Sequence, residues 1–117
     1  ARDFLDMSDF KAFMDLAIKL DAPTGVYNVA SGEAHTIQEI FDLVSSYLGL
    51  GKIEVPVVPP GDDDVPVVSL DASNTSADFG WSAKVPFAEV IERQLKWYDA
   101  HGVNDVYSHL QPGASAD

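Results

Sequence analysis

The strongest secondary-structure signal in this chain predicts a self-capped amphipathic helix over residues 36–48. Thr36 and Glu39 form a capping box, in which the threonine oxygen accepts from the Glu39 amide while the Glu39 carboxylate reaches back to the Thr36 amide. Gly49 stands where a left-handed C-terminal cap is expected. Apolar residues recur at helical spacing and predict one buried face: Ile37, Ile40, Phe41, Val44, Tyr47 and Leu48.

Three further helices are predicted from the same kinds of signal. Asp6 or Ser8 can cap a helix whose buried face would be Phe10, Phe13, Met14, Ala17 and Leu20. A short helix is expected within residues 71–79, closed by Gly80. Pro86 suits the first turn of a last helix ending near Gly102. The inward positions of that last helix would be Phe87, Val90, Ile91, Leu95 and Tyr98.

Short strands are predicted between these helices. Residues 2–5 read as the end of a strand, and residues 26–30, 53–58 and 67–70 are apolar and rich in β-branched side chains. Pro56 makes the third of these an edge or kinked strand. The expected fold is a small α/β layer of short strands and about four helices over residues 1–110, followed by a disordered polar tail at residues 111–117.

Composition excludes several classes of function. The chain has 117 residues, about one domain, and a net charge of −12 with only seven scattered Lys and Arg, which argues against a nucleic-acid partner. No apolar run is long enough for a transmembrane helix, so we expect no membrane partner. Cysteine is absent, which removes disulfides and thiolate chemistry and fits a cytoplasmic protein.

The chain lacks the residues of a self-contained oxidoreductase. It has no glycine-rich G-x-G-x-x-G turn for a dinucleotide, and no tyrosine is followed four residues later by lysine. His35, His101 and His109 are not spaced as zinc ligands, and we interpret them as ordinary surface or partly packed histidines. The triplet Asp62 to Asp64 lacks the pattern of a calcium loop and reads as a solvated acidic loop. We therefore predict neither cofactor-binding nor catalytic residues in this chain.

A series of short motifs nevertheless resembles a known family. In order they are R-D-F-L at residues 2–5, G-V-Y-N-V at 25–29, S-G-E at 31–33 leading into T-I-Q-E-I at 36–40, D-A-S at 71–73 and F-G-W at 79–81. They are similar to the C-terminal portion of extended short-chain dehydrogenase/reductase enzymes, the NAD(P)-dependent nucleotide-sugar epimerases, dehydratases and reductases. The resemblance covers roughly Ala1 to Tyr98, and the chain begins in what looks like the middle of a strand. We expect a lobe that packs on a Rossmann domain absent from this chain.

The resemblance implies a set of nucleotide-binding residues. Arg2 would bind the diphosphate, the alternative being a salt bridge with Asp3 or Asp6. Phe4 would face the ligand. Ile37 would pack on the base or ribose, although an isoleucine at that position is equally a core residue. Asp64 would contact the ribose, with Val68 beside it.

The chain also departs from the family pattern. Many relatives carry an arginine two to four residues before the aspartate as a second diphosphate ligand, where this chain has Pro60, Gly61 and Asp62. A lysine often found after D-A-S is replaced by Asn74. Loss of one charge-assisted contact to phosphate costs about 1.5 to 3 kcal/mol. The missing cation could come from the absent half, the diphosphate could bind weakly, or the role could have been lost.

The implied function is that of the substrate-binding part of a nucleotide-sugar epimerase or dehydratase. NAD or NADP, bound by the absent domain, would serve to oxidise the sugar to a transient ketone before epimerisation or dehydration. The partner would be a nucleoside-diphosphate sugar, and a homodimer could form through the absent domain. Alternatives are a reductase of the same family and a stand-alone, non-catalytic α/β binding module. The helix around residues 10–18 is apolar nearly all round, which favours a missing neighbour.

Overall fold

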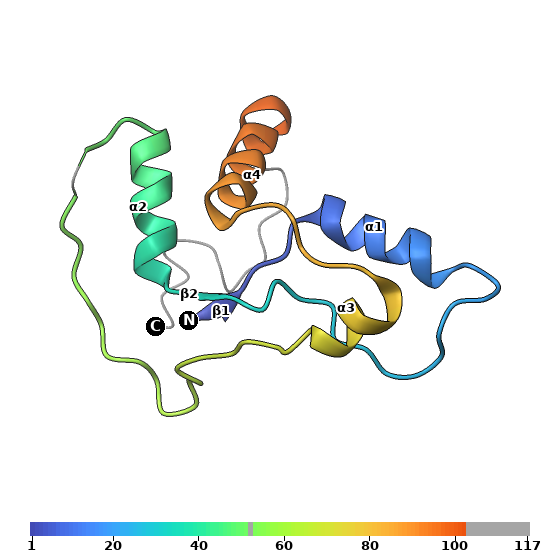
Figure 1. Ribbon diagram of the computed structural model, residues 1–117. Coiled ribbons are helices and arrows are strands. Elements are labelled where there is room, and N and C mark those ends of the chain that lie inside the picture. The colour runs from blue at the N-terminus through green and yellow to red at the C-terminus, as the bar shows by residue number, and fades with distance from the viewer. Residues whose placement is uncertain (52, 103–117) are drawn as a thin grey trace.

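Four helices and one two-stranded sheet make up the part of the chain that the computed structural model describes, residues 1–51 and 53–102. Helices α2 and α4 lie side by side, the short sheet lies at the start of α2, and α1 and α3 lie on the other side of the molecule (Figure 1). This arrangement confirms the expected α/β class with about four helices. The elements in order are β1 (Arg2–Asp3), α1 (Met7–Ala17), β2 (Ala34–His35), α2 (Ile37–Tyr47), α3 (Ser73–Phe79) and α4 (Phe87–His101).

The helix ends follow the predicted capping signals. Asp6 caps α1 and accepts a hydrogen bond from the Ser8 amide. The capping box of α2 is present, with the Thr36 amide 2.6 Å from a Glu39 carboxylate oxygen and the Glu39 amide 3.2 Å from the Thr36 hydroxyl. Gly80 ends α3 in the left-handed region, with φ of 64°. One boundary differs, because α1 ends at Ala17 and leaves the predicted Leu20 outside the helix and fully exposed.

The strands are fewer than the sequence predicts. β1 and β2 pair antiparallel, with Arg2 opposite His35 and Asp3 opposite Ala34. The strand predicted at residues 67–70 is reduced to a single parallel bridge between Val68 and Arg2. The strands predicted at residues 26–30 and 53–58 are wrong: neither segment has a ladder partner among the described residues. An apolar, β-branched segment becomes a strand only when another strand lies beside it.

The best-packed region is an aromatic core between α1, α3 and the segment after α3. The Phe13 ring lies 5.1 Å from Phe79 and 5.6 Å from Trp81, both edge-on. Trp81 is 5% exposed, and its indole N–H donates to the Asp9 carbonyl at 2.9 Å. The carboxylate of Asp9, itself buried, accepts from the amides of Lys84 and Val85. These contacts hold the chain between α3 and α4 against α1.

Residues of the Y-N motif tie this core to α3. The Tyr27 hydroxyl donates to Asp78 at 2.5 Å, which raises the pKa of that phenol. Thr75 is fully buried, and its hydroxyl donates to the Asn28 carbonyl at 2.5 Å. The Asn28 amide in turn donates to the Asp71 carbonyl. The motif residues that marked the family resemblance in this part of the chain are therefore structural.

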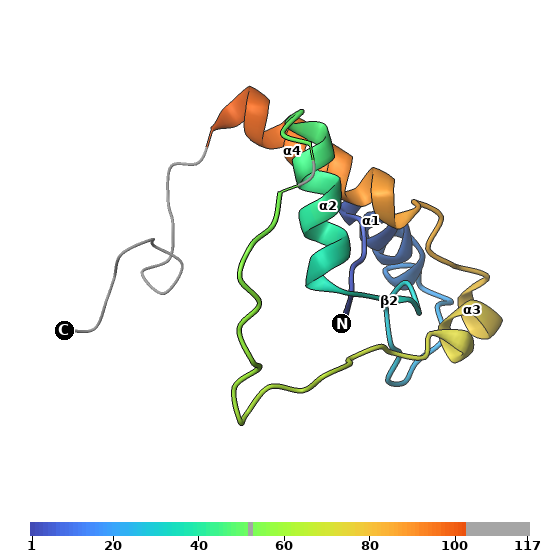
Figure 2. The same cartoon turned by 90° about the vertical axis from the view of Figure 1, so that its left-hand side faces the viewer.

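Helix α4 covers one side of α2, as the two views in Figures 1 and 2 show. Most of the predicted inward positions of α4 are partly buried, but Tyr98 is 41% exposed. In α1 only Phe13 of the predicted apolar face is buried, while Phe10 and Met14 stay 38% and 40% exposed. No helix within the described ranges combines the length and the apolar character of a membrane span.

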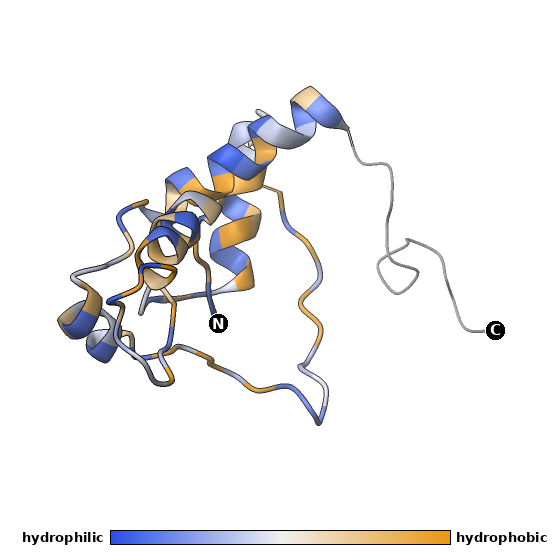
Figure 3. Ribbon diagram, turned by 90° about the vertical axis from the view of Figure 1, so that its right-hand side faces the viewer, coloured by the Kyte–Doolittle hydropathy of each residue, from blue (hydrophilic) through white to orange (hydrophobic). Residues whose placement is uncertain are grey.

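Residues 53–64, here called the outer segment, run outside the body between α2 and α3. Hydrophobic residues colour much of this segment in Figure 3 although it lies away from the helices. Val57 is 90% exposed and Val58 is 78% exposed. The predictions for residues 103–117, including the tail at 111–117, lie outside the described residues.

Candidate functional site

The residues predicted to bind the nucleotide meet at the β1–β2 ribbon. Directly opposed residues of an antiparallel pair share a face, so Arg2 and His35 lie on the same side. The bridge from Arg2 brings Val68 to that side. Phe4 follows β1, and Ile37 begins α2 two residues after His35. We call this set, Arg2, Phe4, His35, Ile37 and Val68, the ribbon face.

Arg2 is held by carbonyl groups. Its Nη1 donates to the Val65 carbonyl at 2.6 Å and to the Ala1 carbonyl at 2.9 Å. Within the described residues, Nε and Nη2 have no acceptor. The alternative salt bridge is not formed there, because the Asp3 carboxylate accepts from residues 31 and 32 and Asp6 pairs with Arg93. Half of the guanidinium fork is therefore open to an anion.

Asp64 directly precedes Val65, whose carbonyl accepts from Arg2, and it belongs to a turn. Its Oδ2 accepts from the Gly61 amide at 2.9 Å, and its own amide donates to the Gly61 carbonyl at 3.0 Å. The Val65 carbonyl that receives the arginine follows it directly. Asp64 is exposed, and its free carboxylate oxygen can accept from a hydroxyl group.

Phe4 and Ile37 differ in how much of each side chain is available. The Phe4 ring is partly buried and lies 5.7 Å from the Phe87 ring at the start of α4. Ile37 is 72% exposed at the first position of α2, so the interpretation as a core residue is wrong within the described part of the chain. Val68 is 38% exposed. The ribbon face thus presents Ile37 and Val68 as apolar surface. Phe4 instead packs against Phe87 of α4 and supports the ribbon there.

His35 is the site residue that the sequence interpretation passed over. Its imidazole stacks on the Phe87 ring at 3.7 Å with an interplanar angle of 3°. Its Nδ1 lies 3.5 Å from Glu39 and its Nε2 lies 3.4 Å from Glu33. No signal in the sequence identified His35, because a two-residue strand directly before the helix was not expected.

Hydrogen bonds from the Thr36 amide and from His35 stabilise the ionised form of the Glu39 carboxylate. The Thr36 amide donates to its carboxylate and, together with contact to His35, holds the pKa of Glu39 below its ordinary value of 4.5. The carboxylate is therefore ionised at neutral pH. The amides of the first α2 turn, at the positive end of the helix dipole, lie at the same edge of the ribbon.

The opposite side of the ribbon is occupied by a structural aspartate. Asp3 Oδ1 accepts from the Ser31 amide at 2.9 Å and from its hydroxyl at 2.6 Å, and Oδ2 accepts from the Gly32 amide at 2.8 Å. Gly32 has a φ of 81°, in the region that favours glycine. Thus in the R-D motif the first residue faces the candidate site and the second holds the 31–33 turn.

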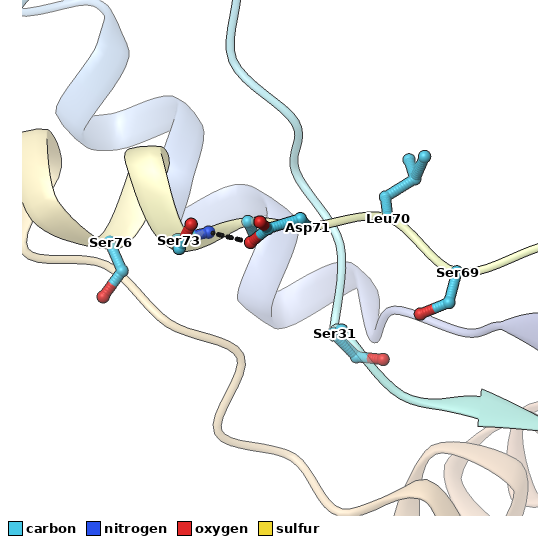
Figure 4. A pocket seen from close by; sticks show the side chains of 8 residues that line it. Ser31, Ser69, Leu70, Asp71, Ser73 and Ser76 are labelled. Carbon is cyan, nitrogen blue, oxygen red and sulfur yellow. Dashed lines mark hydrogen bonds between the residues drawn. The ribbon is translucent and has the colours of Figure 1, made fainter.

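An open pocket of about 460 Å³ lies on this second side, next to the start of α3. Its lining is rich in hydroxyl groups (Figure 4), and the Ser73 amide donates to Asp71 Oδ1 at 2.9 Å. That bond lowers the pKa of Asp71. None of the predicted nucleotide-binding residues lines this pocket, whose residues are Ser31, Gly32, Ser69, Leu70, Asp71, Ala72, Ser73 and Ser76.

Among the described residues, the sheet consists of two antiparallel strands, unlike the open parallel sheet at whose strand ends dinucleotides bind. The sequence also lacks the glycine-rich turn and the tyrosine–lysine pair. Among the described residues no group of three His, Asp or Glu is arranged to hold a metal ion. What the site offers instead is a guanidinium beside exposed apolar side chains, a surface suited to an anion that carries an aromatic or sugar group.

Known proteins resemble the chain in both sequence and structure. The enzyme WbmG of Bordetella bronchiseptica, solved in complex with NAD and UDP, is 56% identical, with a TM-score of 0.81 over 93% of this chain and 34% of its own. Probable GDP-L-fucose synthase 1 of Oryza sativa is 33% identical over 83% of this chain, and GDP-L-fucose synthase 1 of Arabidopsis thaliana is 31% identical. The chain spans 29% of the length of these two curated relatives.

A more distant structure shows the same fold. It is dTDP-glucose 4,6-dehydratase of Bacillus anthracis in complex with NAD, 22% identical, with a TM-score of 0.70 over 85% of this chain and 31% of its own. No protein-family profile matches the chain. Together with the motifs and the fold, these relatives confirm the predicted resemblance: the chain is similar to about a third of an NAD-dependent nucleotide-sugar epimerase or dehydratase, as expected of a C-terminal portion of such an enzyme.

Proposed function

We propose that the complete protein is an NAD(P)-dependent nucleotide-sugar epimerase or dehydratase and that this chain binds its nucleoside diphosphate. The observation that carries the proposal is the ribbon face, which combines the half-open guanidinium of Arg2, the bridged Val68 and the exposed Ile37 at the start of α2. A nucleoside diphosphate combines the anion and the flat apolar base that such a surface fits.

Each predicted residue then has a distinct role. Arg2 donates to phosphate oxygens through Nε and Nη2. Ile37 and Val68 form the apolar wall for the base and ribose, and Asp64 accepts from a ribose hydroxyl. Phe4 holds the ribbon in place through its contact with Phe87. Binding the nucleotide at this remote position orients the sugar toward the rest of the enzyme and contributes to catalysis there.

The relatives support the cofactor and ligand classes. WbmG binds NAD and UDP in its structure, and the dehydratase of Bacillus anthracis binds NAD. When bound, NAD(P) supplies reversible hydride transfer at a sugar carbon. Residues outside this chain hold that cofactor and perform the proton transfers, because the chain has no motif for either task. A homodimer through that part and a cytoplasmic location belong to the same proposal.

A reductase is the second candidate, because both curated relatives are GDP-L-fucose synthases. The non-catalytic binding module is less favoured. Met7 at the start of α1 and Ile18 just after its end are 73% and 74% exposed, and a free-standing module would leave these apolar side chains in water. A neighbouring domain of the same enzyme would cover it.

The proposal is tested with Arg2→Ala in the complete protein. Loss of one charge-assisted hydrogen-bond donor to phosphate costs about 1.5 to 3 kcal/mol, so the Kd for a nucleoside diphosphate rises on the order of ten- to a hundredfold. The melting temperature stays nearly unchanged, since the side chain bonds only to carbonyls that water can satisfy. Isothermal titration calorimetry measures the Kd.

Lys96→Ala is the matched control. Lys96 is also an exposed cation and pairs with Glu92 on α4, away from the ribbon. Its removal changes the net charge equally but leaves nucleotide binding unaltered. Unchanged binding in Arg2→Ala, together with a large loss of stability, would assign Arg2 a purely structural role and contradict the proposal.

A further inference from the structure

We infer that His35 is a second cationic group of the nucleotide surface, so that its protonation tightens binding of the diphosphate. The inference rests on the proposed function and adds to it a residue and a pH dependence. The strand register places His35 directly opposite Arg2 and on the same face. The two side chains therefore leave the ribbon on one face, and an anion bound on that face is exposed to the charge of both.

The imidazole is held in one orientation. It is stacked on Phe87 at 3.7 Å, its two ring nitrogens face Glu33 and Glu39, and its side chain is 19% exposed. Glu39 is fixed in turn by the α2 capping box. A ring packed between an aromatic face and two carboxylates keeps its position when it gains a proton, so protonation changes the charge of the site and not its shape.

The charges around the imidazole come from three elements. β1 brings Arg2, the turn before β2 brings Glu33, and α2 brings Glu39, while α4 presents the uncharged Phe87 ring. With a neutral imidazole, one positive and two negative charges leave the cluster at −1, which disfavours an anion. Protonation of His35 brings the cluster to neutrality. Histidine is the side chain that makes this change near physiological pH.

The other cationic side chains among the described residues are paired with carboxylates or lie away from the ribbon face. Lys11 pairs with Asp15 on α1, and Lys96 pairs with Glu92 on α4. Arg93 is bound by Asp6 and Glu89. Lys19 and Lys84 line a hollow beside α1 and Trp81, and the Ala1 amino group donates to the Pro66 carbonyl. Among the described groups of this set, His35 is the one that stands opposite Arg2 on the ribbon face.

The test measures binding of nucleotide sugars by the complete protein as a function of pH. The probes are UDP-glucose, dTDP-glucose and GDP-L-fucose, whose doubly esterified diphosphates keep a constant charge over the range used. For the probe that binds, we expect the wild-type Kd to fall on the order of three- to tenfold from about pH 8 to pH 6, since one unit charge is added close to the phosphates. His35→Gln should lose this pH dependence and keep the weaker affinity throughout.

Two further variants keep the inference testable if His35→Gln fails to fold. His35→Arg retains a planar cation that can stack on Phe87, so at pH 8 it should bind as tightly as the wild type does at pH 6. Glu33→Gln removes one of the facing carboxylates, so it should tighten binding at pH 8 by a similar factor. The matched control is Glu54→Gln, an exposed carboxylate of the outer segment, with no expected effect.

The outcomes separate the two proposals. Equal pH dependence in the wild type and His35→Gln, or no gain at pH 8 for His35→Arg and Glu33→Gln, would overturn the role of His35 and leave the proposed function standing. Failure of the wild type to bind any of the probes at any pH would contradict the proposed function itself, and the inference with it.

Discussion

The aromatic core around Trp81 and the outer segment both contain large apolar side chains. Those of the core are buried against one another, whereas those of the outer segment are exposed. Trp81, in the segment after α3, and Phe13 of α1 are 5% and 8% exposed and contact each other, while Val57 is 90% exposed. Around the core, side-chain hydrogen bonds reach across as many as 76 residues of sequence. In the outer segment the hydrogen bonds described are those of the Gly61–Asp64 turn.

The difference shows that hydrophobicity alone does not place a segment in a core. What distinguishes the core is a polar frame: Asp9 binds two amides after α3, and Thr75 binds the chain at residue 28. The outer segment has no such side-chain bond to the body among the described residues. Its valines are suited to contact with a surface outside this chain.

The largest effect is expected from Trp81→Ala. Truncating a buried aromatic residue costs about 3 to 5 kcal/mol, and here the Asp9 carbonyl also loses its indole donor. Urea unfolding of the complete protein, followed by circular dichroism, measures the loss. A change below about 1 kcal/mol would show that this core does not stabilise the fold as its burial indicates.

Asp9→Ala tests the polar frame alone. It leaves the amides of Lys84 and Val85 without their acceptor, so we expect a loss of about 2 to 3 kcal/mol in the free energy of unfolding. Asp15→Ala on the same helix is the control, because Asp15 is exposed and pairs only with Lys11. Equal losses in the two variants, measured by the same urea titration, would show that the buried Asp9 carboxylate stabilises the fold no more than the exposed Asp15 carboxylate does.

A pH effect is expected at the start of α2. The Thr36 amide lowers the pKa of Glu39 in the folded protein, so the unfolded chain takes up that proton at higher pH. The resulting stabilisation is complete above the ordinary value of 4.5 and is lost as pH falls through the lowered folded value. Stability curves between about pH 6 and pH 3 should fall less steeply for Glu39→Gln than for the wild type. Identical slopes would mean that the capping box does not form in solution.

The smallest effect is expected from Val57→Ser in the outer segment. An exposed side chain without packing neighbours changes the free energy of unfolding by less than about 0.5 kcal/mol. The free energy of unfolding of the variant should be measured both in the 117-residue chain and in the complete protein. A loss above about 1 kcal/mol in the complete protein alone would show that the rest of the enzyme covers Val57.

Local signals in the sequence predicted the helices, because caps and apolar spacing act within a few residues. The Thr36–Glu39 box and Gly80 were identified in this way and are confirmed. Strands depend on partners distant in sequence, so residues 26–30 and 53–58 were predicted wrongly from composition. The candidate site shows the same limit: the motif pointed to Arg2, but only the register with His35 reveals the second group.

The outer segment has a consequence for how the chain can be divided. It joins a first half, ending with α2, to a second half that begins before α3, and the halves contact each other elsewhere. Helix α4 packs on α2, and Trp81 and Thr75 bond to residues of the first half. A break between Val57 and Val58 severs none of these contacts. The two pieces should therefore reassemble when expressed separately, which makes this segment the natural point for fragment complementation or circular permutation.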